Sequence, residues 1–178
     1  MHLSTEVKLR VARILSTLTR AGLTVIGRDP SSCVCVRNGV RWNLDLNEGI
    51  DLAVYLFGKF ERDVSKALRN QICIGATVLD IGANMGAHTL PIACLVGELG
   101  RVVAVEPTGW AYQKLQRNIQ LNPRLSGRIK TLQAFLNDGS SKIPDRICSS
   151  WNLLEGAAVR HAIHGGSPRD LSGAVALS

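Results

Sequence analysis

The middle of the chain predicts an α/β fold in which helices pack on a parallel β-sheet. Three short apolar segments, at positions 78–81, 102–105 and 129–136, have the composition of buried strands. Between them lie two segments, 86–96 and 110–121, in which apolar residues recur at helical spacing. Alternation of strands with helices of about ten to fifteen residues is typical of a parallel sheet with right-handed crossovers.

The first 70 residues follow a different pattern and predict a small α+β segment. Residues 4–21 have the spacing of an amphipathic helix, which Gly22 is expected to end. The pair Asn38-Gly39 lies between two short apolar segments and suits the type I′ turn of a β-hairpin. Residues 61–70 predict a second helix. We therefore divide the chain into an N-terminal segment at 1–70, a βαβαβ part at 71–143 and an irregular tail at 144–178.

The composition is that of a globular protein large enough to bury a core. The chain has 178 residues, of which 46% are hydrophobic, and its formal net charge is +7. The basic residues are spread along the sequence, and aromatic residues make up 4%. A nucleic-acid surface needs a stripe of positive charge. The sequence therefore predicts no nucleic-acid partner.

The sequence also predicts a soluble, cytoplasmic protein without a membrane segment. Glu6, Lys8 and Arg10 interrupt any apolar region of a signal peptide. The longest apolar run, at 90–97, is too short to span a bilayer. The five cysteines are an odd number without a C-x-x-C pair, so they form neither a zinc pattern nor a disulfide framework. No metal site is expected.

The segment VLDIGANMGAHTL carries the first candidate site. It predicts a strand ending at Asp80, a turn containing Gly82 and Gly86, and then a helix. Such a turn lets the backbone approach a bound nucleoside closely. A dinucleotide fingerprint would have glycines where Asn84 and Ala87 stand, which argues against NAD or FAD. Asp80 could organise the turn or reach a ligand amine through water.

An acid follows the next predicted strand. Glu106 comes directly after the apolar segment 102–105 and lies 24 positions after Gly82. In nucleoside-binding folds, an acid about 20 residues beyond the glycine turn accepts hydrogen bonds from the ribose hydroxyls. Glu106 is therefore predicted to bind a ribose, and a solvated acid at a strand end is the alternative.

Together the two segments closely resemble the S-adenosylmethionine-dependent methyltransferases of the FkbM type. The first motif of that family runs D-x-G-A-N-x-G-x-x-T, and the second runs E-P followed by a helix with L-x-x-N. The resemblance covers residues 76–139 and implies a Rossmann-like class I methyltransferase sheet, here incomplete. The residues that match the two motifs are Asp80, Gly82, Ala83, Asn84, Gly86, Thr89, Glu106, Pro107, Leu115 and Asn118.

The resemblance implies that 71–143 binds S-adenosylmethionine and transfers its methyl group, usually to an oxygen of a small-molecule or sugar-type acceptor. The glycine turn would hold the methionine part of the cofactor, and Glu106 the ribose. Many class I enzymes place an acid near the end of the third strand to meet the adenine amino group. Asp138 is the nearest candidate, although it could be a turn residue, and Phe135 could pack against the base instead. No catalytic base can be identified.

Residues 144–178 show no clear periodicity, and His161 and His164 are interpreted as loop residues. Members of the family continue with a fourth strand carrying K-x-D-x-E/D-G. This chain has no such segment, although 173–178 is similar to its beginning. We therefore expect a fragment with weak or no catalysis alone. Two alternatives remain: a non-catalytic module that binds the cofactor or pairs through the exposed edge of the first strand with a second chain, and an NAD-dependent oxidoreductase.

Overall fold

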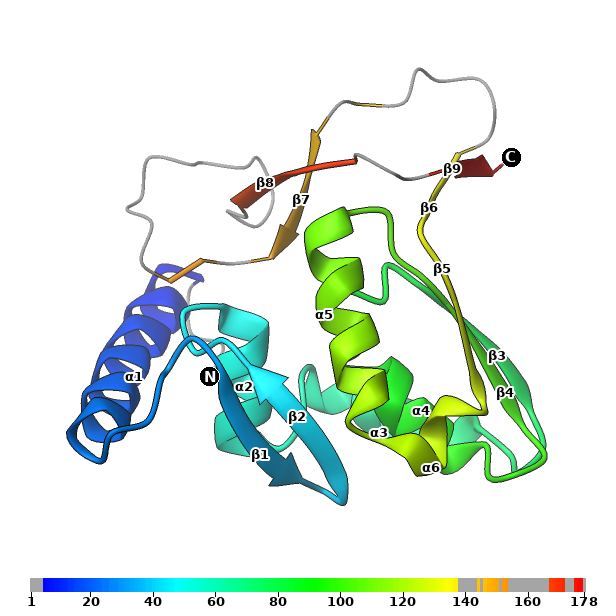
Figure 1. Ribbon diagram of the computed structural model, residues 1–178, viewed down its shortest axis with the longest axis horizontal. Helices are drawn as coiled ribbons and strands as arrows, with labels where there is room; N and C mark the ends of the chain where they lie inside the picture. Colours follow the sequence, from blue (N-terminus) through cyan, green and yellow to red (C-terminus); the bar gives the residue numbers. More distant parts are fainter. Residues whose placement is uncertain are drawn as a thin grey trace.

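The structure is a computed structural model that describes residues 5–137, 144, 146–150, 152–153, 167–171 and 175–177 (Figure 1). Its elements in chain order are α1 (Thr5–Val25), β1 (Cys33–Arg37), β2 (Val40–Leu44), α2 (Gly49–Phe57), α3 (Arg62–Gln71), β3 (Thr77–Ile81), α4 (Thr89–Leu95), β4 (Arg101–Val105), α5 (Gly109–Gln120), α6 (Pro123–Ser126), β5 (Ile129–Leu132), β6 (Ala134–Leu136), β7 (Arg146–Ser150), β8 (Ser167–Asp170) and β9 (Val175–Leu177).

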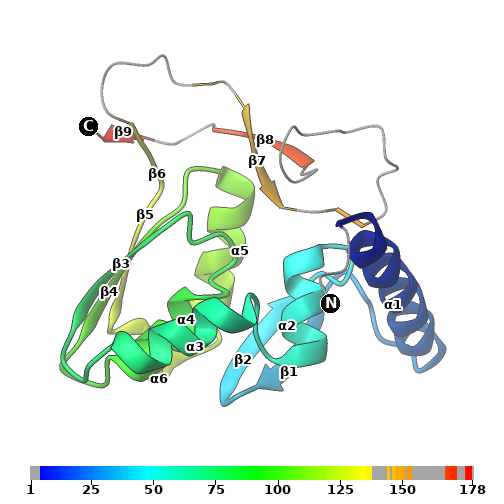
Figure 2. The ribbon, with the colours of Figure 1, turned by 180° about the vertical axis from the view of Figure 1, so that it is seen from behind.

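The central element is a parallel three-stranded sheet with the order β3-β4-β5, so the predicted Rossmann-like α/β fold with a parallel sheet is confirmed. Ile81 of β3 lies beside Val105 of β4, which lies beside Leu132 of β5. The carboxyl ends of the three strands therefore meet at one edge. Helix α4 joins the first two strands, and α5 and α6 join the second pair. These helices lie on the same side of the sheet (Figure 1, Figure 2).

The sheet is buried at its centre and exposed at β3. Val102 and Ala104 of β4 are fully buried among the helices. On β3, by contrast, the side chains of Leu79 and Ile81 are 56% and 61% exposed. Within the described part of the chain, β3 pairs with β4 alone and is therefore an edge strand.

The predicted hairpin is confirmed as the antiparallel pair β1-β2. Asn38 and Gly39 both adopt positive φ, at 51° and 78°, as a type I′ turn requires. Trp42 and Leu44 of β2 are buried in the hydrophobic core. Alternation along β2 thus directs one face of the hairpin into the molecule.

Two asparagine side chains, Asn118 of α5 and Asn122 just before α6, pair with the free edge of β2. The Asn43 N–H donates to Asn118 Oδ1 at 2.8 Å, and the Arg41 N–H donates to Asn122 Oδ1 at 2.9 Å. Asn122 Nδ2 in turn donates to the Arg41 carbonyl at 2.6 Å. These amides satisfy backbone groups that would otherwise be buried without partners, and they attach the N-terminal hairpin to the parallel sheet's helical layer.

Helix α1 is longer than the sequence predicted, and the expectation that Gly22 ends it is wrong. The helix continues to Val25, and Gly27, which has a φ of 73°, lies two residues beyond its end. The Arg28 N–H donates to the Leu23 carbonyl and the Gly27 N–H to the Thr24 carbonyl. This pair of bonds is a Schellman motif, which needs a left-handed residue one position after the cap.

Three further expectations about elements need correction. Helix α2 was not predicted, because its nearly continuous apolar sequence has no clear period. The predicted strand at 129–136 is divided at Gln133 into β5, which pairs with β4, and β6, which pairs with β9. The tail, expected to be irregular, contains the strands β7, β8 and β9. The division into segments at 70 and 143 stays a prediction.

Candidate functional site

The turn that follows β3 is bound to the end of β4. The N–H groups of Gly82 and Ala83 both donate to the Val105 carbonyl, at 2.8 and 3.0 Å. The turn therefore lies at the carboxyl edge of the sheet, where ligands bind in open α/β folds. The sequence placed the candidate turn and the candidate acid at this edge, and the structure brings them into contact.

Three residues of the turn have positive φ: Gly82 at 79°, Asn84 at 49° and Gly86 at 95°. A Cβ atom added to Gly86 would lie 2.9 Å from Leu115 Cδ1, so glycine here allows α5 to pack closely against the turn. A Cβ atom added to Gly82 would meet no atom within 4 Å. The backbone of Gly82 consequently faces open space, as a surface that receives a ligand must.

Glu106 follows β4 directly, is 3% exposed and binds the turn. Its Oε2 accepts a hydrogen bond from the Asn84 N–H at 2.9 Å. Its Oε1 accepts from the Thr108 N–H at 2.9 Å and from the Thr108 hydroxyl at 2.5 Å. A carboxylate has about four acceptor positions, so roughly one is left for a further donor. The Thr108 hydroxyl can also rotate away, which would release a second.

Asp80 connects the strand to the next helix. It lies within β3, and its Oδ2 accepts a hydrogen bond of 2.5 Å from the hydroxyl of Thr89, a fully buried residue that begins α4. Of the two roles that the sequence left open for Asp80, this geometry supports the organisation of the turn. Pro91, the third residue of α4, lies in the opening turn of the helix, where its missing N–H costs no hydrogen bond.

Asn118 of α5 binds the backbone of the turn. Its Nδ2 donates to the Met85 carbonyl at 3.0 Å, while its Oδ1 accepts from the Asn43 N–H. The residue is fully buried. The sequence identified Asn118 as a motif residue, but only the structure shows that it joins the turn to the hairpin.

Some residues near the site were missed, and some predicted ones cannot be placed. His88 Nε2 lies 3.2 Å from Glu61 Oε2 beside the start of α4, and no sequence pattern had selected this pair. Asp138, His161 and His164 lie outside the described residues. In the ranges that the structure describes, no three His, Cys, Asp or Glu side chains could hold a metal ion, and no helix combines the length and apolar character needed to cross a bilayer.

A buried ion pair joins α5 to α2. Lys114 Nζ is 2.6 Å from Asp51 Oδ1 and 4.6 Å from the centre of the Trp110 ring. Asp51 is 1% exposed, and its Oδ2 has no hydrogen-bond partner. Burial therefore raises the pKa of Asp51, and this outweighs the opposing effect of Lys114.

No protein-family model and no curated protein matches this chain. Solved structures that resemble it include a protein from Clostridium thermocellum provisionally described as an rRNA methylase, at 24% identity and a TM-score of 0.38, covering 40% of this chain and 38% of that one. A protein from Pyrococcus horikoshii provisionally described as a transferase has 20% identity, a TM-score of 0.45 and coverage of 65% and 46%. TYW2 from P. horikoshii, solved in complex with MeSAdo, has 24% identity, a TM-score of 0.42 and coverage of 58% and 36%.

The similar part thus spans less than half the length of each of these structures. Such distant similarity assigns no activity or ligand to this chain. The function is inferred from the geometry of the site.

Proposed function

We propose that this chain binds S-adenosylmethionine at the carboxyl edge of β3 and β4 and acts in methyl transfer. The observation that carries the proposal is the hydrogen bond between the Asn84 N–H and Glu106, which joins the glycine turn and the strand-end acid into one unit. A close-approach turn beside a carboxylate is the arrangement that holds a nucleoside and its ribose. We assign the chain to the FkbM-type branch on the motif residues alone.

In this proposal, different residues of 71–143 contact different parts of the cofactor. The turn from Gly82 to Gly86 receives the methionine part, because its backbone faces open space at Gly82. Glu106 accepts hydrogen bonds from the ribose through its free acceptor position and through exchange with the Thr108 hydroxyl. Asp138 meets the adenine amino group, and half-buried Phe135 is the alternative contact to the base.

When bound, S-adenosylmethionine supplies an electrophilic methyl group on a positively charged sulfur. The chain's own contribution is to fix the position of this group, since orientation can supply much of the rate in a transfer between two bound partners. The hydrogen bond between Thr89 and Asp80 joins the helix and the strand on either side of the turn, and Asn118 binds the Met85 carbonyl within it. The turn therefore keeps its shape without the ligand.

The acceptor that we propose is an oxygen of a small molecule, in line with the prediction from the sequence of no nucleic-acid partner. The structure adds one fact that bears on this point. Lys59, Arg62, Lys66 and Arg69 gather around an open hollow of about 440 Å³, although they form no run in the sequence. We name these four residues the α3 basic cluster. An RNA acceptor is the alternative that a screen must include, because clustered cations bind phosphates.

The first test is isothermal titration calorimetry with S-adenosylhomocysteine on the wild type and on Glu106→Gln. We expect the variant to bind at least about tenfold more weakly, because an amide replaces one acceptor oxygen with a donor. Glu98→Gln is the matched control, since Glu98 is exposed on the loop before β4. Equal affinity for both variants would refute the role of Glu106. Binding of NAD in place of S-adenosylhomocysteine would favour the oxidoreductase alternative.

A second function, partner binding, is favoured by the exposed edge strand. β3 leaves backbone donors and acceptors unpaired on one side within the described residues, and Leu79 and Ile81 are exposed beside them. Such an edge is a template for another strand. We propose that a second copy of this chain pairs there.

A further inference from the structure

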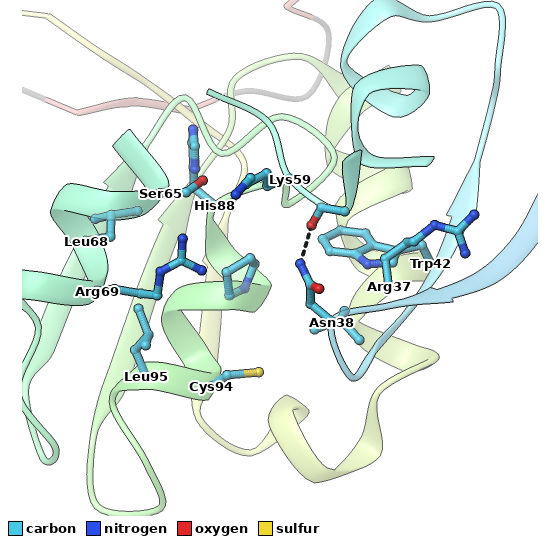
Figure 3. A pocket seen from close by; sticks show the side chains of 13 residues that line it. Arg37, Asn38, Trp42, Lys59, Ser65, Leu68, Arg69, His88, Cys94 and Leu95 are labelled. Atoms are coloured by element: carbon cyan, nitrogen blue, oxygen red, sulfur yellow. Dashed lines mark hydrogen bonds between the residues drawn. The ribbon is translucent and has the colours of Figure 1, made fainter. Parts of the chain in front are cut away.

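A cavity of about 190 Å³ lies between the β1-β2 hairpin, α3 and α4 (Figure 3). Its apolar wall is formed by Trp42 of the hairpin, Leu68 of α3, and Pro91 and Leu95 of α4. Neither the turn residues 82–86 nor Glu106 are among the residues that line it. The cavity is therefore a separate feature from the cofactor site proposed above.

Three cations line the cavity without an ion-pair partner in the described part of the chain: Arg37, Lys59 and Arg69. Arg37 donates hydrogen bonds to backbone carbonyls, which leaves Lys59 and Arg69 as the lining cations available to a ligand. Both also line the hollow of the α3 basic cluster, so the cavity and the hollow adjoin. In Figure 3 the Arg69 side chain extends from α3 towards the space between the helices, and Trp42 lies on the opposite side. An anion in this space would meet charge-assisted hydrogen-bond donors.

The other charged residues around the cavity are already engaged. His88 pairs with Glu61. The Arg37 guanidinium lies 4.7 Å from the centre of the Tyr55 ring and donates to the Tyr55 carbonyl. Because these contacts hold the guanidinium, we do not assign Arg37 a role in ligand binding. No acid is among the lining residues, and Asp63 lines only the neighbouring hollow. The unbalanced charge at the cavity is consequently positive.

Trp42 adds a polar group to the apolar wall. The residue is 1% exposed, and its indole N–H has no hydrogen-bond partner. Buried donors normally have an acceptor. The Trp42 indole is thus a buried donor in the cavity wall that still lacks its acceptor.

We infer that this cavity binds an aromatic carboxylate with a single ring. A cavity of about 150 Å³ holds benzene, so the somewhat larger volume here leaves room for a ring and one small acidic group. The ring lies against Leu68, Pro91 and Leu95, with the Trp42 indole N–H at its edge, and the carboxylate faces Lys59 and Arg69. A larger ligand would have to extend into the open hollow.

The test is a titration of benzoate into the full-length, ¹⁵N-labelled protein without S-adenosylmethionine, followed by the indole N–H resonance of Trp42. The chain has three tryptophans, and Trp42→Phe assigns the signal. We expect a saturable shift of the Trp42 resonance. Benzyl alcohol, which has the ring without the charge, and acetate, which has the charge without the ring, should each bind at least about tenfold more weakly. No saturable shift, or equal binding of either fragment, would overturn the inference.

Variants check the location of the site. Arg69→Ala should weaken benzoate binding at least about fivefold, because it removes a charged donor from an exposed position without touching the core. Arg117→Ala, the same change at an exposed site on α5, should leave the affinity unchanged. Cys94→Phe, at an exposed residue of the cavity lining, should abolish binding by filling the space. Equal effects of the two arginine variants would overturn the inference, whereas the cofactor proposal would stand, because no cofactor takes part.

Discussion

At the residue scale, the turn depends on a close contact between Gly86 and Leu115. Gly86 has a φ of 95°, where an L side chain is strained, and the space of its missing Cβ is occupied by a buried leucine. The contact sets how near α5 lies to the turn. Glycine is thus needed at position 86 for packing, whereas at position 82 it leaves the backbone open to a ligand.

Gly86→Ala should therefore destabilise the protein by about 2–4 kcal/mol, from the left-handed backbone together with overpacking. The measurement is the free energy of unfolding in urea. Gly127→Ala is the matched control: Gly127 has a φ of −66° and nothing within 4 Å of an added Cβ, so its stability should hardly change. An equal loss in the two variants would show that the contact with Leu115 has no special weight.

Single residues of the site could be predicted where their chemistry lies in a local pattern. Gly82, Gly86 and Glu106 stand at the ends of apolar segments, and the sequence identified them correctly as neighbours of one sheet edge. The partners of Asn118 could not be predicted, because they are backbone atoms 33 and 75 positions away. A side-chain pattern contains no information about which carbonyl an amide will meet.

At the element scale, α5 holds the molecule together. Its inner face packs against the turn through Leu115, its Asn118 binds β2, and its Lys114 pairs with Asp51 at the start of α2. The helix itself was predicted from its spacing of apolar residues. Helix α2 and the break between β5 and β6 were not, since the first has no clear period and the second depends on pairing with β9, far along the chain.

Lys114→Met should destabilise the protein by about 3 kcal/mol near neutral pH, because Asp51 would be left buried and charged without a cation. The loss should shrink as the pH is lowered. The pKa of Asp51 is raised above 3.8 in the folded state. At a pH between 3.8 and this raised pKa, the folded protein therefore binds more protons than the unfolded one. Its free energy of unfolding then falls as the pH rises through the folded-state pKa. Without Lys114 this pKa rises further, so the dependence extends to higher pH.

Urea unfolding at about pH 5 and about pH 8 measures this dependence. Lys130→Met, which removes an exposed lysine from β5, should show no comparable loss at either pH. A deficit of Lys114→Met that is the same at both pH values would mean that Asp51 does not titrate in this range.

At the scale of the whole molecule, the helices lie on one side of the parallel sheet, and β3 forms its edge (Figure 2). The exposed edge of the first strand was expected from the resemblance to the FkbM-type methyltransferases, in which later strands pair with it. The face that carries Leu79 and Ile81 remains accessible in the described structure. Accessible apolar side chains beside an unpaired strand edge favour association between chains.

Ile81→Lys should reduce self-association, because a charge on an edge strand opposes pairing. Sedimentation velocity over a range of protein concentrations measures the effect. The control is Leu99→Lys, at a side chain that is 82% exposed but lies between α4 and β4. A wild type that sediments as a monomer throughout, or equal behaviour of the two variants, would rule out pairing through β3.

The central claim is that one edge of the sheet holds S-adenosylmethionine between the glycine turn and Glu106. A crystal structure of the protein with S-adenosylhomocysteine tests it most directly. We predict that the amino-acid part of the ligand lies over Gly82 and that both ribose hydroxyls donate to the Glu106 carboxylate, with the Thr108 hydroxyl displaced. A ligand bound elsewhere, or a ribose that leaves the Glu106 bonds to Asn84 and Thr108 unchanged and makes none of its own, would contradict the account.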